Sequence, residues 1–284
     1  MDLLISIGKR IIPKPAKWAV GRFAASLPFN PFSKSITPPR RLSLLYGADE
    51  RKKEWKWLGR LRDHGLKPYH KVLDVGCGAG RTAIPLTTYL SRAQGGSYDG
   101  FDIVPHGIKF CQRRITPRFP HFNFQQADIY NRFYKPKGRY KASEYRFPFN
   151  DNVFDMVYLT SVFTHMLTQD MKHYMSEISR VLKPGGKSFI TYFLLNDETK
   201  NLMMSKVSQF DFCYQIDERS YTADPNVPEA AVAYDDTYIL ELYRMYCLNL
   251  CELHYGCWRV YKSSDHTLSY WDYQDLAIAV KVEK

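Results

Sequence analysis

Three glycines spaced two apart, Gly76, Gly78 and Gly80, follow the apolar run VLDV at residues 72–75. Branched and long apolar residues in such a run predict a strand that is buried on both faces. A turn made of glycines lets another group approach the backbone closely, because no side chain stands in the way. Asp74 adds a carboxylate beside this turn. A carboxylate there would repel a phosphate, so the pattern favours a cationic ligand with an ammonium group.

Two phosphate-binding patterns compete with this interpretation. The dinucleotide fingerprint Gly-x-Gly-x-x-Gly places a pyrophosphate on a helix N-terminus, but here Arg81 stands where the third glycine belongs. The Gly-Lys-Ser/Thr signature of a phosphate loop is also missing after the glycines. A nicotinamide oxidoreductase is therefore an alternative that Arg81 disfavours.

The glycines belong to a regular alternation of strand-like and helical stretches. Strands are predicted at residues 71–75, 97–104, 122–128, 153–161, 187–193, 251–260 and 275–282. Helices are predicted before the first strand from Asp49, after the glycines to about residue 92, and at 106–115, 168–182 and 235–248. This alternation predicts a doubly wound α/β fold with a mostly parallel sheet. Ligands of such folds bind beyond the carboxyl ends of the strands, so we expect the glycines to face a ligand.

Three motifs carry a resemblance to a known family. VLDVGCGAGR at residues 72–81 resembles the first motif of the class I S-adenosylmethionine-dependent methyltransferases of the broad small-molecule type. Residues 147–166 and 177–191 resemble the family's fourth-strand and fifth-strand motifs, in the expected order and spacing. The resemblance covers roughly residues 70–193. It implies a Rossmann-like methyltransferase fold, with a seven-stranded, mostly parallel sheet, an antiparallel C-terminal strand and helices on both faces.

The resemblance implies S-adenosyl-L-methionine as the cofactor and gives the first turn its role. Asp74 and the backbone of Gly76, Cys77 and Gly78 would hold the methionine end of the cofactor. Its ammonium group needs acceptors and its carboxylate needs N–H groups, and this stretch offers both.

The ends of the second and third strands are implied to hold the nucleoside. Asp102 would accept both ribose hydroxyls, and we prefer it to Asp99 because Ile103 follows it and offers adenine an apolar face. Asp128 would take the adenine amino group, with Ile129 on the other side of the ring.

Ser161 and His165 lie where the resemblance implies methyl transfer. Ser161, ending the fourth strand, would lie near the reacting methyl group. A hydroxyl or amine acceptor must lose a proton, and His165 is the candidate base, with packing under the cofactor as the other interpretation of this residue. Four further residues could line the acceptor pocket or simply belong to the core: Tyr192, Tyr234, His254 and Trp258.

The positive charge of the chain is concentrated in its first part. The net charge is +11, and residues 1–70 contribute 15 basic against 5 acidic residues, so the remainder is nearly neutral. This distribution disfavours a nucleic-acid substrate. Residues 1–46 form a basic, apolar extension, which we expect either to contact an anionic membrane peripherally or to pack on the domain. Residues 47–284 would be the methyltransferase domain, with 196–235 as a substrate-cap insertion.

The cysteines indicate the redox compartment in which we expect the protein to work. The six cysteines form no Cys-x-x-Cys pair, and no stretch has the length of a membrane span. We expect reduced thiols in a cytoplasmic protein and no metal site.

The sequence as a whole favours an enzyme that methylates a small molecule, at oxygen rather than nitrogen. The alternative is a methyltransferase-fold protein that binds the nucleoside as a scaffold or regulatory partner without catalysis.

Overall fold

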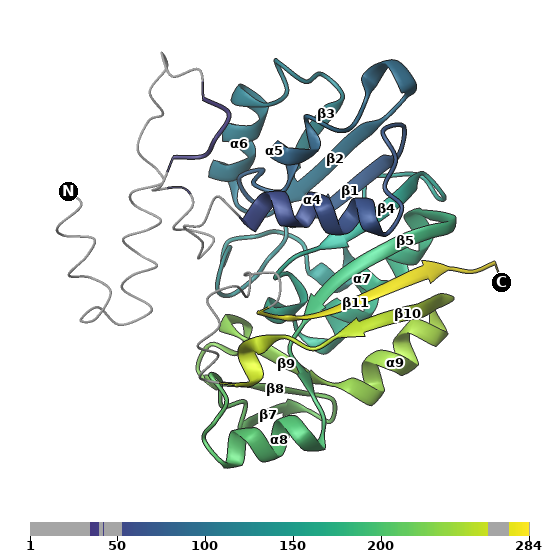
Figure 1. Cartoon of the computed structure of the whole chain (residues 1–284). Helices are drawn as coiled ribbons and strands as arrows, with labels where there is room; N and C mark the ends of the chain where they lie inside the picture. Colours follow the sequence, from purple (N-terminus) through teal and green to yellow (C-terminus); the bar gives the residue numbers. More distant parts are fainter. Residues whose placement is uncertain (1–34, 40–41, 43–52, 261–272, 284) are drawn as a thin grey trace.

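A seven-stranded sheet forms the centre of the computed structural model, which describes residues 35–39, 42, 53–260 and 273–283 (Figure 1). Its strands lie in the order β10 (Leu248–His254), β11 (Asp275–Lys281), β5 (Leu182–Tyr192), β4 (Phe154–Leu159), β1 (Lys71–Val75), β2 (Ser97–Asp102) and β3 (Phe122–Gln126). Strand β1 pairs in parallel with β2 and β4, whereas β11 runs antiparallel to both β5 and β10. The predicted doubly wound sheet with its antiparallel C-terminal strand is confirmed.

Alternation along β1 divides the core into two faces. Val72 packs on one face with helices α4 (Lys53–Asp63), α5 (Ala83–Leu86) and α6 (Pro105–Arg114). Leu73 and Val75 pack on the other face with α7 (Thr168–Val181) and α9 (Asp236–Met245). Since successive side chains point to opposite faces, Asp74 shares the first face with Val72. Figure 1 shows these helices on the two sides of the sheet.

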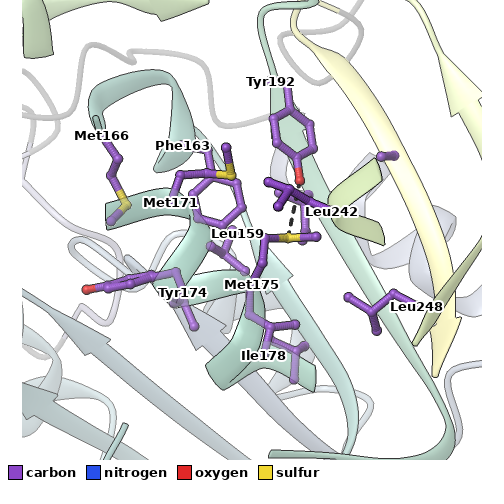
Figure 2. Packing of buried hydrophobic residues seen from close by; sticks show 14 of the residues in the cluster. Leu159, Phe163, Met166, Met171, Tyr174, Met175, Ile178, Tyr192, Leu242 and Leu248 are labelled. Atoms are coloured by element: carbon purple, nitrogen blue, oxygen red, sulfur yellow. Dashed lines mark hydrogen bonds between the residues drawn. The ribbon is translucent and has the colours of Figure 1, made fainter. Parts of the chain in front are cut away.

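Helix α7 buries an apolar face whose residues are spaced three or four apart. Met171, Met175 and Ile178 are buried beside Phe163 and Tyr192, whose hydroxyl donates to the Met175 sulfur at 3.6 Å (Figure 2). The helix ends at Val181, one residue before the predicted end. The KPGG segment, which separates the predicted helix from the predicted strand at 187–193, lies within β5, where the register against β4 shifts between Phe154 and Met156.

The helix after the glycines is much shorter than predicted. We expected it to reach about residue 92, but α5 ends at Leu86. Thr87 and Thr88 follow, and their hydroxyls donate to the carbonyls of Ile84 and Pro85 at 2.7 and 2.8 Å. Such side-chain bonds compete with continued helical bonding, and β-branched residues are weak helix formers.

A second, four-stranded sheet follows β5. Its order is β6 (Leu194–Leu195), β9 (Val232–Asp235), β8 (Ser220–Thr222) and β7 (Tyr214–Asp217), and helix α8 (Asp197–Met204) belongs to the same region. An aromatic cluster holds it together, comprising Phe193, Phe212 and Trp258. Residues 196–235, expected as a substrate cap, therefore form most of this second sheet (Figure 1).

Most of the basic extension at 1–46 lies outside the described residues, and so does the predicted helix start at Asp49. Within the described residues this helix is α4, and Gly65 at φ +95° follows its end, with the Leu66 N–H donating to the Leu61 carbonyl at 2.9 Å. A glycine with a positive φ is a common way for a helix to end. Within the described ranges, no helix combines the length and apolarity that crossing a membrane requires.

Candidate functional site

A cavity opens at the carboxyl edge of the sheet, where β1 lies between β2 and β4. From β1 the chain continues to α5 on one face of the sheet, and from β4 it continues to α7 on the other face. The neighbouring strands β1 and β4 therefore form the switch point of the doubly wound fold. The residues that line the cavity come from the carboxyl ends of four strands and from α7. They are residues 75–78 and 81–82 after β1, 101–104 at the end of β2, 129–131, 134 and 142 after β3, 160–162, 165 and 166 after β4, and 170 and 174 of α7.

The three glycines of the turn have two different surroundings: one packs against another part of the protein, and the other two line the cavity. A Cβ on Gly80 would lie 2.8 Å from both the Cys111 sulfur and Ile115 Cδ1 of the α6 region, and its φ is +75°. The expectation that all three glycines face a ligand is therefore wrong for Gly80, which permits close packing on α6. Gly76 and Gly78 do line the cavity, together with Cys77.

Asp102 brings a buried carboxylate to the cavity wall. It ends β2 and is only 7% exposed. Its oxygens accept hydrogen bonds from the N–H of Gly78 at 2.8 Å and of Val104 at 2.7 Å. Burial raises the pKa of Asp102 to about 6, while these backbone bonds oppose the rise. Asp99 accepts instead from the Asn123 amide at 3.2 Å and does not line the cavity.

Asp74 lies beneath the cavity rather than in its wall. Its side chain is fully buried, and one carboxylate oxygen accepts from the hydroxyls of Thr82 and Tyr98, both at 2.6 Å. Burial raises the pKa of Asp74 to about 6. The expected direct contact with an ammonium group is not supported by this position, because the alternation of β1 points the carboxylate at the α5 face. Instead, Asp74 ties β1 to the residue that precedes α5.

Asp128 also lies outside the cavity. Strand β3 ends at Gln126, two residues before the predicted end, so the loop rather than the strand sets the direction of this side chain. Its carboxylate is half exposed and pairs with Lys135 at 2.6 Å, which lowers the pKa of Asp128. The expected contact with an adenine amino group is therefore not supported, whereas its neighbour Ile129 does line the cavity.

Ser161 follows β4 in a strained backbone conformation. Its φ of +57° is unusual for a residue with a side chain and is typical of functional sites. Two contacts hold it there: its N–H donates to the Thr191 hydroxyl at 2.8 Å, and its hydroxyl donates to Gln274 at 2.9 Å. Ser161 lines the cavity as expected from its place at the strand end.

His165 lies in the short helix η4 (Phe163–His165) and is one of the residues that line the cavity. Nδ1 is 2.9 Å from the carbonyl oxygen of Glu229. A carbonyl can only accept, so Nδ1 carries the proton and Nε2 keeps its lone pair. The hydroxyl of Tyr134 lies 3.4 Å from Nε2. Burial lowers the pKa of His165 below its ordinary value, which favours the neutral ring at pH 7.

Sequence reasoning missed several residues of the cavity wall. Tyr134 and Asn131 lie in an irregular loop without periodicity, so no pattern could have selected them. Asp170 and Tyr174 lie on α7, and burial raises the pKa of Asp170. The four further candidates, Tyr192, Tyr234, His254 and Trp258, do not line the cavity.

Comparisons with known proteins agree with this geometry. Residues 73–190 match a family model described as a methyltransferase domain. The chain is 31% identical over 149 residues to phthiotriol/phenolphthiotriol dimycocerosates methyltransferase 1 of Mycobacterium ulcerans (strain Agy99), which covers 52% of this chain and 47% of that protein. It is 29% identical over 134 residues to sterol 24-C-methyltransferase erg6 of Schizosaccharomyces pombe, covering 47% of this chain and 30% of that protein. These alignments span less than half the length of each relative.

A solved structure shares the fold. A crystal structure of a Pyrococcus horikoshii OT3 protein superimposes with a TM-score of 0.52 at 18% identity, covering 82% of this chain and 92% of the other. At this identity the likeness concerns the fold alone.

Proposed function

We propose that residues 73–190, which match a methyltransferase domain, form a class I S-adenosylmethionine-dependent methyltransferase domain, and that the chain transfers a methyl group to a small, lipid-like acceptor. Oxygen is the favoured acceptor atom, as the sequence analysis expects. The observation that carries the proposal is one cavity bordered by the glycine turn, the buried carboxylate of Asp102 and the ring of His165.

The residues of the cavity fit S-adenosylmethionine. The carboxylate of Asp102 accepts one backbone N–H on each oxygen. Each oxygen can accept a further bond, which suits the two ribose hydroxyls. Ile103 and Ile129 offer apolar surface for adenine, and the turn from Gly76 to Gly78 would hold the methionine end. Asp74 would act indirectly, by fixing the start of α5 through Thr82.

Bound S-adenosylmethionine supplies a methyl group that is already activated by its sulfonium sulfur. The protein therefore has to align the acceptor, exclude water and take up a proton. His165 Nε2, which keeps its lone pair, would accept the proton that the acceptor hydroxyl loses. Ser161, held at φ +57°, would lie near the methyl group.

Apolar and aromatic groups near His165 support a lipid-like acceptor. Tyr130, Met166 and Tyr174 line the cavity with it, and Phe133 lies parallel to the His165 ring, with ring centres 6.1 Å apart. The relatives are named for dimycocerosates and for a sterol, both of which are apolar acceptors. The basic, apolar residues 1–46 would bring the protein to a membrane surface where such molecules lie.

Label transfer tests this proposal. The full chain is incubated with methyl-labelled S-adenosylmethionine and a lipid extract, and the products are separated by chromatography. We expect label in an organic-soluble product, with the methyl group on oxygen by mass spectrometry, and none with Asp102→Ala. Tight binding of S-adenosylhomocysteine without label transfer to lipid or polar fractions would instead favour the non-catalytic scaffold.

A further inference from the structure

The second sheet is bonded to the turn that carries His165, although it lies far along the chain. Strand β9 contributes Tyr234, and the short helix η5 (Pro228–Ala230) contributes the carbonyl of Glu229. We propose that this sheet positions the base: Tyr234 is a positioning residue that holds η4 against Glu229 and so keeps His165 in its Nδ1–H form. This inference rests on the proposed function of His165.

The single O–H of Tyr234 lies between the carbonyls at the two ends of the turn, which share its one proton. This hydroxyl lies 2.9 Å from the carbonyl oxygen of Phe163 and 2.5 Å from that of Met166, the residues at the start and just after the end of η4. The side chain is fully buried, so water does not compete for these carbonyls. The backbone of Tyr234 is itself fixed, because it pairs with Leu194 of β6 and Ser220 of β8.

Glu229 supplies the acceptor that selects the tautomer. It lies five residues before Tyr234, so the two contacts on η4 come from one short segment of chain. The segment is anchored at both sides: the Glu229 carboxylate accepts from the Arg132 N–H at 3.0 Å, and the Thr222 hydroxyl donates to the Pro228 carbonyl at 3.1 Å. A change in the position of η4 relative to this segment would therefore break the bond to Nδ1.

The chemical consequence concerns Nε2. Only the Nδ1–H form leaves a lone pair on Nε2, and only this form accepts a proton there. Two other contacts do not select the tautomer: the Asn131 amide donates to the His165 backbone carbonyl at 2.9 Å, and the Tyr134 hydroxyl can either donate to or accept from Nε2. The bond from Nδ1–H to the Glu229 carbonyl thus decides whether Nε2 can accept a proton or can only donate one.

The ring tautomer can be measured directly, without an acceptor. The full chain is labelled with 15N-histidine, and the His165 signals are assigned by comparison with His165→Gln. We expect the parent protein to show a protonated Nδ1 and an unprotonated Nε2 at pH 7. In Tyr234→Phe, which keeps the ring but removes the hydroxyl, we expect the Nε2–H form to increase about fivefold, the change that loss of about 1 kcal/mol gives.

Tyr243→Phe is the matched control, because it also removes a buried hydroxyl, one that lies 3.2 Å from the Tyr192 hydroxyl and is not bonded to η4. Calorimetry with S-adenosylhomocysteine distinguishes a failure of the positioning role from a failure of the proposed function. Parent-like binding by Tyr234→Phe with an altered His165 signal supports the positioning role. An unchanged signal in Tyr234→Phe, or an equal change in Tyr243→Phe, overturns it. Failure of the parent to bind S-adenosylhomocysteine would instead contradict the proposed function.

Discussion

At the scale of single residues, the site depends on two polar side chains whose burial sets their protonation. Asp102 keeps its carboxylate at the cavity wall through two backbone N–H donors. His165 keeps a neutral ring because burial lowers its pKa; the bond from Nδ1–H to the Glu229 carbonyl opposes that shift but fixes the proton on Nδ1. The first group is placed to hold a ligand and the second to accept a proton. Their loss should therefore affect different steps.

His165→Ala should reduce turnover by about 10²- to 10⁴-fold, which is the range that a positioned base contributes. Affinity for S-adenosylhomocysteine should stay within about twofold, since the ring is not proposed to hold the cofactor. Steady-state kinetics with the acceptor found by label transfer, together with calorimetry, checks both values. An equal loss of cofactor affinity, or an unchanged rate, would assign His165 to packing.

Affinity for S-adenosylhomocysteine should depend on pH through Asp102. The ribose hydroxyls donate to the ionised carboxylate, so affinity falls as pH falls through the pKa of about 6. We expect a constant Kd above about pH 7 and a loss approaching tenfold per unit well below pH 6. Calorimetry across pH 5 to 8 measures this. Asp102→Asn should flatten the profile, and a slope that persists in it would point to another buried carboxyl group, Asp74 or the cavity-lining Asp170, whose pKa values are also raised.

At the scale of elements, the seven strands of the central sheet were predictable, whereas the second sheet and the connections were not. Continuous apolar runs identified β1 and β4, because burial on both faces leaves a strong pattern in the sequence. The early end of α5 depends on the hydroxyl of Thr87, which bonds to the Ile84 carbonyl. The buried position of the Asp74 carboxylate depends on the hydroxyls of Thr82 and Tyr98. Asp128 was misplaced for a similar reason, because the loop after β3 and Lys135 set its direction.

Two substitutions in the glycine turn should have different effects on the free energy of unfolding and on the affinity for S-adenosylhomocysteine. Gly80→Ala places a Cβ 2.8 Å from the Cys111 sulfur at φ +75°, so we expect it to lower the free energy of unfolding by about 1–3 kcal/mol. Gly78→Ala, at φ +57° in the cavity wall, should cost about 1–2 kcal/mol of stability but weaken S-adenosylhomocysteine binding more than Gly80→Ala does. Thermal denaturation and calorimetry measure the two effects. The opposite ranking in affinity would show that Gly78 serves only the turn.

At the scale of the whole molecule, charge and chemistry are separated along the chain. Residues 1–46 carry eight basic residues and one acidic residue, whereas residues 71–284 are nearly neutral. Apolar residues between the basic ones suit an anionic surface, and Pro13 and Pro15 limit any helix in the extension. The extension would therefore concentrate the domain at its substrate without taking part in the reaction.

Deletion of residues 1–46 should abolish binding to anionic vesicles while cofactor binding stays intact. Each basic residue near such a bilayer contributes about 1 kcal/mol, and this attraction weakens as salt increases. Sedimentation with phosphatidylserine vesicles at two salt concentrations measures the effect, with neutral vesicles as the control. Loss of cofactor binding or precipitation of the truncated chain would instead place the extension within the fold.

The central claim is that the cavity at the β1–β4 switch point binds S-adenosylmethionine through Asp102, and calorimetry with S-adenosylhomocysteine tests it most directly. We predict micromolar binding by the parent chain, no comparable binding of NAD, and parent-like affinity for Asp99→Ala on the same strand. Asp102→Ala should bind about 30- to 1,000-fold more weakly, because about 2–4 kcal/mol of charge-assisted hydrogen bonding is lost. Parent-like affinity in Asp102→Ala, or equal binding of NAD, would contradict the claim.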